Sequence, residues 1–458
     1  MNNEKYLARN IDQALMEWKD NPRRKPLLLR GARQVGKSSS VRHFGKNFKY
    51  FLEVNVERNP EVVEFFQGSR DVKTIAAKLS DFFDVPVIPG ETLLFLDEVQ
   101  KSTDVIHSLW FFKEDYPQLH VIAAGSLLEF ALKDLSSFGV GRVSSLFIYP
   151  MSFDEFLTAT GKAGLLRAKR KSDANHPLEV AFYGKLVEAF RSYMLVGGMP
   201  EAVSTYAETG SYRYSSDIVN EIIQGYQDDF AKYSAKANPT LLRQTLISVA
   251  HQAGAKFVYS RVEGEYRSSE VKAALEMLKD AGLIIPTYHT DANGVPLGAE
   301  INERVVKYLL HDTGVLLAIL GIDDDTDQLI KELMVADSID LVDKGHVAEM
   351  LAGLELIKYA SPQKRHQLYY WQNMNKGTCA EVDYVIARGG NIVPIEVKSG
   401  VKGSMSSMYS LMRNPQKHIE GGIRCSLENF GCFDSPEGKR IDIIPLYAIS
   451  NLFQGKTM

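Results

Sequence analysis

The residues with the clearest chemical meaning lie in a glycine-rich stretch near the N-terminus. The pattern G-x-x-x-x-G-K-S runs from Gly31 through Gly36 to Lys37 and Ser38, after the apolar run PLLLR and before a helical segment. Backbone amides at the start of such a helix face phosphate groups. The lysine adds a positive charge, and the serine hydroxyl is a ligand for Mg²⁺. The pattern predicts a nucleotide site, and the alternative is a glycine-rich turn ahead of a helix.

Two adjacent acids, Asp97 and Glu98, end the apolar run LLFLDE. Asp97 is expected to hold Mg²⁺ through water, and Glu98 to orient and deprotonate an attacking water. Acids at a strand end are often only solvated, but beside a phosphate loop they indicate hydrolysis. The predicted nucleotide-binding residues are Gly31, Ala32, Arg33, Gln34, Val35, Gly36, Lys37, Ser38, Ser39 and Asp97.

Strands and helices alternate in the first 150 residues and would position these groups. Five apolar runs recur between helical stretches: PLLLRG, YFLEVNV, TLLFLDE, HVIAAGS and SLFIYP. This spacing predicts crossover units and a parallel sheet buried on both faces. The expected fold class is therefore α/β, with helices on both faces of the N-terminal sheet.

A second group of charged residues lies near the C-terminus, in AEVDYVIARGGNIVPIEVKSG. Asp383, Glu396 and Lys398 form the pattern D-x₁₂-E-x-K, the core of the PD-(D/E)xK nuclease-like fold. The E-x-K tripeptide occurs four times in the chain, and only this copy sits on a β run. In a strand, Glu396 and Lys398 share one face.

Glu349, on the helix GHVAEMLAGLELIKY, would complete this nuclease-like site. Asp383 and Glu396 are expected to hold Mg²⁺, with Glu349 helping directly or through water. Lys398 would orient the attacking water or stabilise the charge that develops on phosphorus. The alternative is a buried network of carboxylates and lysine that is retained for structure.

Residues 1 to about 160 resemble the AAA+ class of P-loop ATPases, in a prokaryotic and archaeal branch fused to a C-terminal domain of unknown function. The phosphate loop, the acidic pair and GRVSSLFIYPMSFDEFL carry the resemblance, with Met151 where the family has Leu. It implies ATP and Mg²⁺ as cofactors, and Ser126 as the polar residue that contacts the γ-phosphate or the attacking water. It also makes Arg142 a candidate arginine finger, although a surface arginine that caps the turn is an equal alternative. The family's second sensor arginine is not identifiable in the lid.

The resemblance extends over nearly the whole chain. YMLVGGMPEAV matches a Gly-Gly-Met-Pro-Glu signature, interpreted as a structural turn, and Asp312 to Gly314 match an Asp-Thr-Gly turn with no assigned chemistry. The stretch from 165 to 180 is basic and polar, and we expect a solvated loop. The expected domains are an AAA+ core (1–160), a helical lid or linker (161–235), a winged-helix domain (236–320) and a nuclease-like domain (321–458).

The amino-acid composition limits the kinds of partner and site that the protein could have. The formal net charge of −4 provides no global basic field, so a nucleic-acid contact would need local patches. One candidate is a strip of cations in the C-terminal domain: Lys402, Arg413, Lys417, His418 and Arg424. Three cysteines without a C-x-x-C pair argue against a disulfide framework or zinc site. With no apolar signal region and no run long enough to cross a membrane, we expect a cytoplasmic protein with no membrane contact.

The leading hypothesis is a Mg²⁺-dependent AAA+ ATPase that acts on or is regulated by nucleic acid, with DNA favoured over RNA. The alternative is a nucleotide-dependent switch whose C-terminal domain is a non-catalytic partner-binding module. A small-molecule kinase is disfavoured, because Asp97 and Glu98 suit water activation and no substrate lid is apparent. Because AAA+ sites commonly lie between subunits, assembly into a homo-oligomer is also expected.

Overall fold

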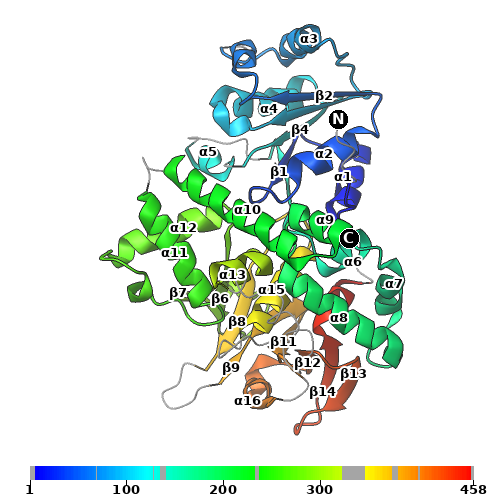
Figure 1. Cartoon of the computed structure of the whole chain (residues 1–458), viewed down its shortest axis with the longest axis vertical. Helices are drawn as coiled ribbons and strands as arrows, with labels where there is room; N and C mark the ends of the chain where they lie inside the picture. Colours follow the sequence, from blue (N-terminus) through cyan, green and yellow to red (C-terminus); the bar gives the residue numbers. More distant parts are fainter. Residues whose placement is uncertain are drawn as a thin grey trace. The chain divides into compact units, whose positions relative to one another are not determined.

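The computed structural model describes residues 6–68, 70–126, 128–134, 141–232, 237–321, 346–373, 380–400 and 403–454. It separates into two compact units (Figure 1). Unit 1 consists of Met1–Tyr149 with the short segments Asp280–Gly282 and Ser361–Arg365, and unit 2 contains the rest. The expected domain boundary at 235/236 lies outside the described residues, and the four-domain division stays a prediction.

Unit 1 contains a parallel sheet of five strands in the order β2-β3-β4-β1-β5. The strands are β1 (Leu27–Arg30), β2 (Tyr50–Asn55), β3 (Thr92–Asp97), β4 (His120–Ala124) and β5 (Ser144–Phe147). These strands correspond to the five apolar runs, and β3 and β4 are buried along their whole length. The predicted α/β class and parallel sheet are confirmed.

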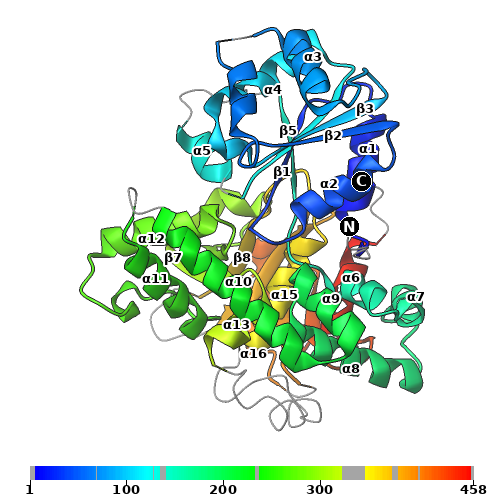
Figure 2. The same ribbon diagram turned by 45° about the horizontal axis from the view of Figure 1, so that its top comes forward.

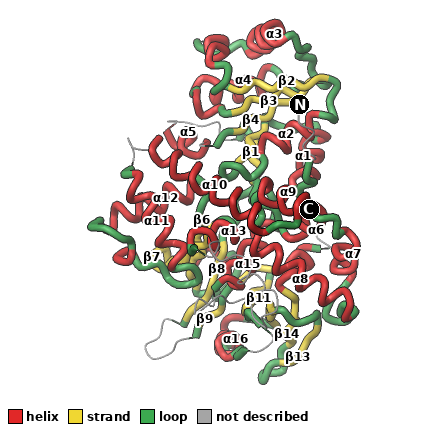
Figure 3. The backbone as a smooth tube through the Cα atoms, viewed as in Figure 1, coloured by secondary structure: helices red, strands yellow, loops and turns green. Residues whose placement is uncertain are grey.

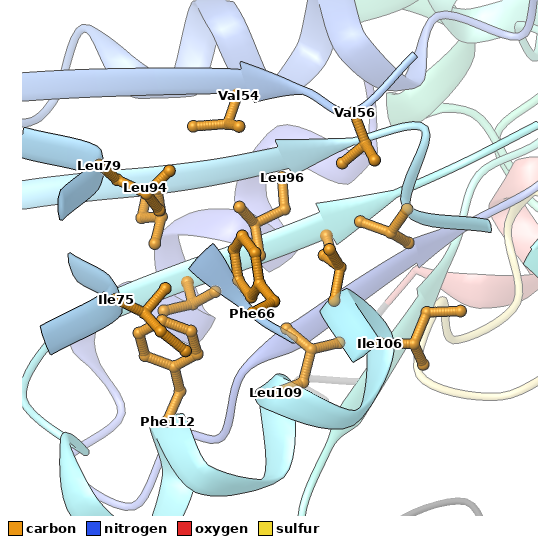
Figure 4. Close-up of a cluster of buried hydrophobic side chains, with 14 of the residues drawn as sticks. Val54, Val56, Phe66, Ile75, Leu79, Leu94, Leu96, Ile106, Leu109 and Phe112 are labelled. Atoms are coloured by element: carbon orange, nitrogen blue, oxygen red, sulfur yellow. The ribbon is translucent and has the colours of Figure 1, made fainter. Parts of the chain in front are cut away.

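Helices cover both faces of this sheet (Figure 2). The helices are α1 (Ile11–Asp20), α2 (Lys37–Gly45), α3 (Val72–Phe83), α4 (Thr103–Asp115) and α5 (Leu128–Asp134). Helices α3 and α4 pack on one face, where Ile75, Leu109 and Phe112 meet Leu94 and Leu96 in a buried apolar cluster (Figure 4). Helices α1 and α2 pack together on the other face. Burial on both faces explains why these strands read as continuous apolar runs.

Unit 2 combines a helical part with two sheets (Figure 3). Its helices are α6 (Phe153–Ala159), α7 (Ala163–Lys171), α8 (Val180–Val196), α9 (Pro200–Thr209), α10 (Tyr212–Lys232), α11 (Pro239–His251), α12 (Ser268–Asp280), α13 (Thr313–Ile319), α15 (Val347–Lys358) and α16 (Ser406–Met412). Its strands are β6 (Ile284–Thr290), β7 (Ile301–Leu310), β8 (Leu368–Gln372), β9 (Glu381–Val382), β10 (Tyr384–Arg388), β11 (Asn391–Val397), β12 (Gly421–Ser426), β13 (Gly431–Asp434) and β14 (Arg440–Pro445).

The two sheets of unit 2 have the orders β7-β6-β8-β9 and β10-β11-β12-β14-β13. In the second sheet β10 and β11 form an antiparallel hairpin, and β11, β12 and β14 are parallel. In the first sheet β6 pairs with β7 on one side and with β8 on the other. The β6–β7 hairpin is therefore part of a four-stranded sheet rather than a free wing, and the winged-helix assignment stays a prediction.

The expectation of a solvated loop over 165–180 is wrong for its first half, which belongs to α7. Lys169 of α7 is fully buried, and its ammonium donates to the Asp154 carboxylate and to Ser450 Oγ. A run rich in Lys and Arg suggests a solvated loop, but the buried carboxylate of Asp154 supplies a partner that only the fold brings close.

The two family-like turns lie against each other in unit 2. The backbone N–H of Gly198 donates to Asp312 Oδ2 at 2.6 Å, and Asp312 Oδ1 accepts from Val315 N at 3.2 Å. A Cβ on Gly197 would lie 2.2 Å from Asp312 Oδ1, and one on Gly198 would lie 2.2 Å from Met151 O. Close packing thus requires both glycines, which supports the structural interpretation of the Gly-Gly signature.

Within the described ranges, no helix combines the length and the apolar composition needed to span a bilayer.

Candidate functional site

The glycine-rich loop joins the carboxyl end of β1 to the amino end of α2, as its sequence context predicts. The backbone at Gly31, Gln34 and Gly36 has φ of +155°, +63° and +92°. A Cβ on Gly31 would lie 2.2 Å from the carbonyl oxygen of Ile148, so the loop needs glycine there for space as well as for conformation. This tightly turned backbone places the start of α2 at the carboxyl edge of the sheet, where helix N-termini bind phosphates.

Lys37 is folded along its own loop. Its ammonium donates to the carbonyl oxygens of Gly31 at 2.9 Å and Ala32 at 2.6 Å, and the side chain is only 8% exposed. Burial lowers the pKa of Lys37 to about 8, although the negative charges of Glu98 and Asp97 act in the opposite direction. Two neutral carbonyls compensate a buried charge poorly, so anionic phosphate oxygens would be better partners for this ammonium.

Asp97 and Ser38 lie together beside the loop. Ser38 Oγ donates to Asp97 Oδ2 at 2.9 Å, while Asp97 Oδ1 accepts from the N–H of Glu98 at 3.0 Å. Burial raises the pKa of Asp97, partly offset by the hydrogen bond from Ser38. A hydroxyl and a carboxylate are oxygen ligands of the kind Mg²⁺ takes, with phosphates and waters completing its octahedron. These residues therefore fit the expected cation.

Glu98 has a left-handed backbone, with φ of +55°. Its Oε2 accepts hydrogen bonds from Ser126 Oγ at 3.1 Å and from Gln100 Nε2 at 2.5 Å. Ser126 therefore lies next to the predicted catalytic carboxylate, as the resemblance implies for a sensor residue. The structure brings Lys37, Ser38, Asp97, Glu98 and Ser126 to one edge of the sheet.

Sequence reasoning missed Gln100. Its side chain is confined, because a Cβ on Gly125 would lie 2.0 Å from Gln100 Oε1. That oxygen is buried without a hydrogen-bond partner. The signal in the sequence was a glutamine two residues after the predicted catalytic glutamate, and this spacing has no meaning until the fold turns Gln100 back toward Glu98.

Arg9 also helps to hold the phosphate loop in place. Its guanidinium donates to the carbonyl oxygens of Val35 at 2.8 Å and Tyr149 at 2.6 Å, and the residue is 8% exposed. It ties the phosphate loop to the segment after β5. No motif points to this arginine, because both of its acceptors are backbone carbonyls.

Arg142 does not join the group around the phosphate loop. Its guanidinium forms an ion pair with Glu114 at 2.8 Å and lies 4.7 Å from the centre of the Trp110 ring. Glu114 is at the end of α4, and Arg142 precedes β5, so both lie at the amino edge of the parallel sheet. The phosphate loop follows β1 at the opposite, carboxyl edge.

The charged C-terminal residues lie close together in unit 2. Lys398 pairs with Glu396 at 2.7 Å, and Asp383 Oδ2 accepts from the N–H of Val397 at 2.7 Å. Burial and the negative charges of Glu349 and Glu396 hold the pKa of Asp383 well above its usual range. All four residues predicted for the nuclease-like site are thus neighbours.

A fifth charged residue, Lys307 of β7, enters the same cluster and was not anticipated. Its ammonium contacts Glu349 Oε1 at 2.9 Å and Glu381 Oε1 at 2.5 Å, and the residue is 1% exposed. Among the residues that the structure describes, no group of three His, Cys, Asp or Glu side chains is arranged to hold a metal ion. In this structure Glu349, Asp383 and Glu396 therefore do not form such a group, and their role in a nuclease-like site stays a prediction.

The strip of cations proposed for a phosphate backbone is exposed only in part, at Arg413 and His418. Lys417 is buried and donates to Asn293 Oδ1 at 2.9 Å, and Arg424 donates to Glu428 Oε2 at 2.6 Å. Arg413 is paired with Glu437. These pairings could not be inferred from charge spacing alone. Lys402 lies outside the described residues.

Comparison with known protein families gives three matches. Residues 23–157 match the family described as AAA domain. We refer to this matched segment, which is similar to AAA domains, as the AAA domain. It contains the phosphate loop, the acidic pair and Ser126, and AAA domains are nucleotide-binding P-loop ATPases. The other two matches are to domains of unknown function, DUF8612 over 187–326 and DUF4143 over 344–449.

No curated protein matches the chain. Solved structures similar to it include Orc1 of Aeropyrum pernix in complex with DNA, at 12% identity and a TM-score of 0.29, covering 71% of this chain and 94% of that one. Another is Drosophila ORC bound to DNA, at 15% identity and a TM-score of 0.24, covering 68% and 85%. At these scores the likeness supports no inference.

Proposed function

We propose that this chain is a Mg²⁺-dependent ATPase in which Glu98 activates the attacking water. The observation that carries the proposal is the continuous set of contacts from Ser38 through Asp97 and Glu98 to Ser126, directly beside the phosphate loop. Hydrolysis of a triphosphate needs groups that bind the phosphates, a site for a cation and a base close to the attacking water. Each of these roles has a residue in the AAA domain.

The roles follow from the positions of the groups. Loop amides and Lys37 would hold the β- and γ-phosphates, while Ser38 and Asp97 would hold Mg²⁺. The cation, when bound, supplies positive charge that offsets the charge building on the phosphate oxygens. Glu98 would accept the proton of the attacking water, and Ser126 would fix the Glu98 carboxylate while facing the γ-phosphate.

Substitution of the two central residues tests this assignment. Glu98→Gln keeps the size and hydrogen-bonding shape but removes the base, so it should bind ATP normally while kcat falls by about 10²-fold or more. Lys37→Ala should instead weaken nucleotide binding. Equilibrium binding of a fluorescent ATP analogue and phosphate release distinguish the two effects. Glu61→Gln, an exposed acid in the same unit, is the matched control, and wild-type turnover in Glu98→Gln would refute the assignment of the base.

We also propose that the C-terminal domain is a partner-binding module controlled by the nucleotide, rather than a nuclease. Two observations favour this over an enzyme that cleaves nucleic acid. Lys307 pairs with Glu349, one of the expected metal ligands, and two cations of the expected phosphate-contacting strip, Lys417 and Arg424, are buried and hydrogen-bonded within the domain. Nucleic acid, with DNA favoured over RNA, remains a candidate partner.

Two measurements separate the module from the nuclease. ATP turnover is measured with and without duplex, single-stranded and branched DNA, and with RNA. The same nucleic acids are incubated with Mg²⁺ or Mn²⁺ and the wild type or Asp383→Ala. The module hypothesis predicts no cleavage above the Asp383→Ala control, and Asp383-dependent cleavage would restore the nuclease hypothesis. Stimulated turnover without cleavage would identify the nucleic acid as the regulating partner.

A further inference from the structure

We infer that Lys307 takes the place of a metal ion in the C-terminal carboxylate cluster, so that this nuclease-like site is closed by a lysine of the chain itself. The cluster consists of Lys307, Glu349, Glu381, Asp383, Glu396 and Lys398. The inference accounts for the finding that, among the described residues, the expected acids are not grouped as metal ligands. It deepens the proposed non-catalytic role of the C-terminal domain.

The contacts of Lys307 are those of a central cation. Its ammonium lies between a carboxylate of α15, Glu349, and one of β9, Glu381, and it sits 4.9 Å from the ring centre of Tyr370. Lys307 itself is on β7, 42 residues before Glu349 and 74 before Glu381. A buried ammonium requires full compensation, and here two carboxylates and an aromatic face provide it.

The same contacts use the oxygen atoms that a metal would need. Glu349 Oε1 is held by Lys307, and Glu349 Oε2 lies 3.4 Å from His346 Nδ1. Asp383 Oδ2 accepts from a backbone N–H, and Glu396 Oε1 is paired with Lys398. Glu396 Oε2 is buried without a partner. Mg²⁺ requires a near-ideal octahedron of oxygen ligands, and among the five carboxylate oxygens named here only Glu396 Oε2 has no partner, so the set does not supply one.

Lys307 also links elements that are distant in the sequence. It connects β7 of the four-stranded sheet to α15, whose backbone is tied in turn to the second sheet, because Tyr384 of β10 donates to the carbonyl oxygen of Glu349 at 2.8 Å. A metal ion in a nuclease-like site would link α15 to the β10–β11 hairpin. The lysine instead draws the β6–β7 hairpin onto the same helix, so the fold should not depend on divalent cations.

The decisive variants change charge while keeping size. Lys307→Met removes the ammonium and leaves Glu349 and Glu381 facing each other. In nucleotide-free protein with EDTA, the unfolding temperature of unit 2 should fall by about 5–10 °C. Hydrogen exchange should rise in peptides that cover β7, α15 and β9. Mn²⁺ at millimolar concentration should reverse about half of this fall in the unfolding temperature, because Glu349 and Glu381, which no longer pair with a lysine, can then bind a cation.

Two further variants test the pairing. Lys307→Met with Glu349→Gln removes both charges of the buried Lys307–Glu349 pair and leaves only the more exposed Glu381. Stability should therefore recover without Mn²⁺, and Mn²⁺ should add nothing. Lys358→Met is the matched control, because Lys358 is a buried lysine on α15 that pairs with Glu355 and does not touch the cluster. It should lose stability with no recovery in Mn²⁺. Wild-type protein should unfold at the same temperature in EDTA and in Mn²⁺.

Each alternative outcome contradicts the inference. If Mn²⁺ stabilises the wild type as much as Lys307→Met, the metal site is open and Lys307 does not fill it. If Lys307→Met is destabilised but Mn²⁺ does not help, Lys307 is an ordinary ion pair. If Lys307→Met is as stable as the wild type, the cluster does not need the lysine. None of these measurements uses ATP turnover or nucleic-acid cleavage, so failure of the inference is distinguishable from failure of the proposed function.

Discussion

At the scale of single residues, hydrogen bonds around Glu98 decide how the AAA domain could work. A glutamate acts as a base only if its carboxylate points to the attacking water. A flexible side chain would adopt other orientations for much of the time. Here the left-handed backbone at Glu98 and the hydrogen bonds from Ser126 and Gln100 hold the carboxylate in one orientation. Ser126 was expected from the resemblance, whereas Gln100 was found only in the structure.

Replacing Gln100 should therefore slow catalysis without affecting nucleotide binding. Gln100→Leu removes one hydrogen bond to Glu98 Oε2 and should lower kcat by about tenfold, the equivalent of one such bond. The dissociation constant for ATP should stay within about twofold, because Gln100 touches no residue of the phosphate loop. Steady-state phosphate release and nucleotide titration measure the two quantities.

Gln67→Leu provides the control, since Gln67 is exposed in the same unit. An unchanged kcat in Gln100→Leu would mean that Ser126 alone orients Glu98.

At the scale of elements, close backbone contacts hold the helical part of unit 2 together. The turn between α8 and α9 contains Gly197 and Gly198, and it packs against Asp312 at the start of α13. Helix α6 begins beside the same turn, because Met151 N donates to Gly198 O at 2.6 Å. Four helices thus meet at a point where no side chain larger than hydrogen fits.

A methyl group at this point should be costly. Gly198→Ala places a Cβ 2.2 Å from Met151 O, and the backbone must move to relieve the overlap. We expect a loss of about 2–4 kcal/mol in the free energy of unfolding of unit 2, the range of strongly overpacked positions. Chemical denaturation followed by circular dichroism measures it.

Gly210→Ala is a useful comparison, because a Cβ at Gly210 meets no atom within 4 Å. Its positive φ of +68° still costs about 1 kcal/mol. Gly198 is not among the glycines with positive φ, so its loss should come from crowding alone. A loss in Gly198→Ala no larger than that in Gly210→Ala would show that the turn shifts to accommodate the methyl group.

At the scale of the whole molecule, the position of Arg142 determines whether it could act in its own nucleotide site or only in that of a second copy. Its ion pair with Glu114 lies at the amino edge of the sheet, and the phosphate loop lies at the carboxyl edge of the same sheet. Arg142 therefore cannot serve its own nucleotide site while the AAA domain keeps this fold. A role as an arginine finger requires the site of a second copy.

This geometry predicts nucleotide-dependent assembly if Arg142 is a finger. In the Glu98→Gln background with ATP and Mg²⁺, light scattering should show oligomers. Arg142→Ala in the wild-type background should lower turnover by about 10³-fold with little change in ATP affinity. Arg23→Ala, an exposed arginine of the same unit, is the control.

A strict monomer under every nucleotide condition would assign Arg142 the structural role, in which it stacks on Trp110 and pairs with Glu114.

The features that could be predicted from the sequence are those formed by residues adjacent in the chain. The phosphate loop is a run of neighbouring residues whose glycines set the backbone, and Asp97 and Glu98 end a strand whose burial is visible as an apolar run. The parallel sheet follows from the spacing of five such runs. Local chemistry and local conformation coincide there, so the nucleotide site and the α/β class could be predicted.

Tertiary structure alone decided how the charged residues are paired. Lys169 looked solvated and is buried against Asp154, the cations at 417 and 424 looked open and are engaged, and Lys307 looked unremarkable and sits in the carboxylate cluster. An ion pair depends on distance in space, and the partners of Lys307, Glu349 and Glu381, lie 42 and 74 residues away in the sequence. Composition shows that a charge exists, but only packing determines which opposite charge or dipole compensates it.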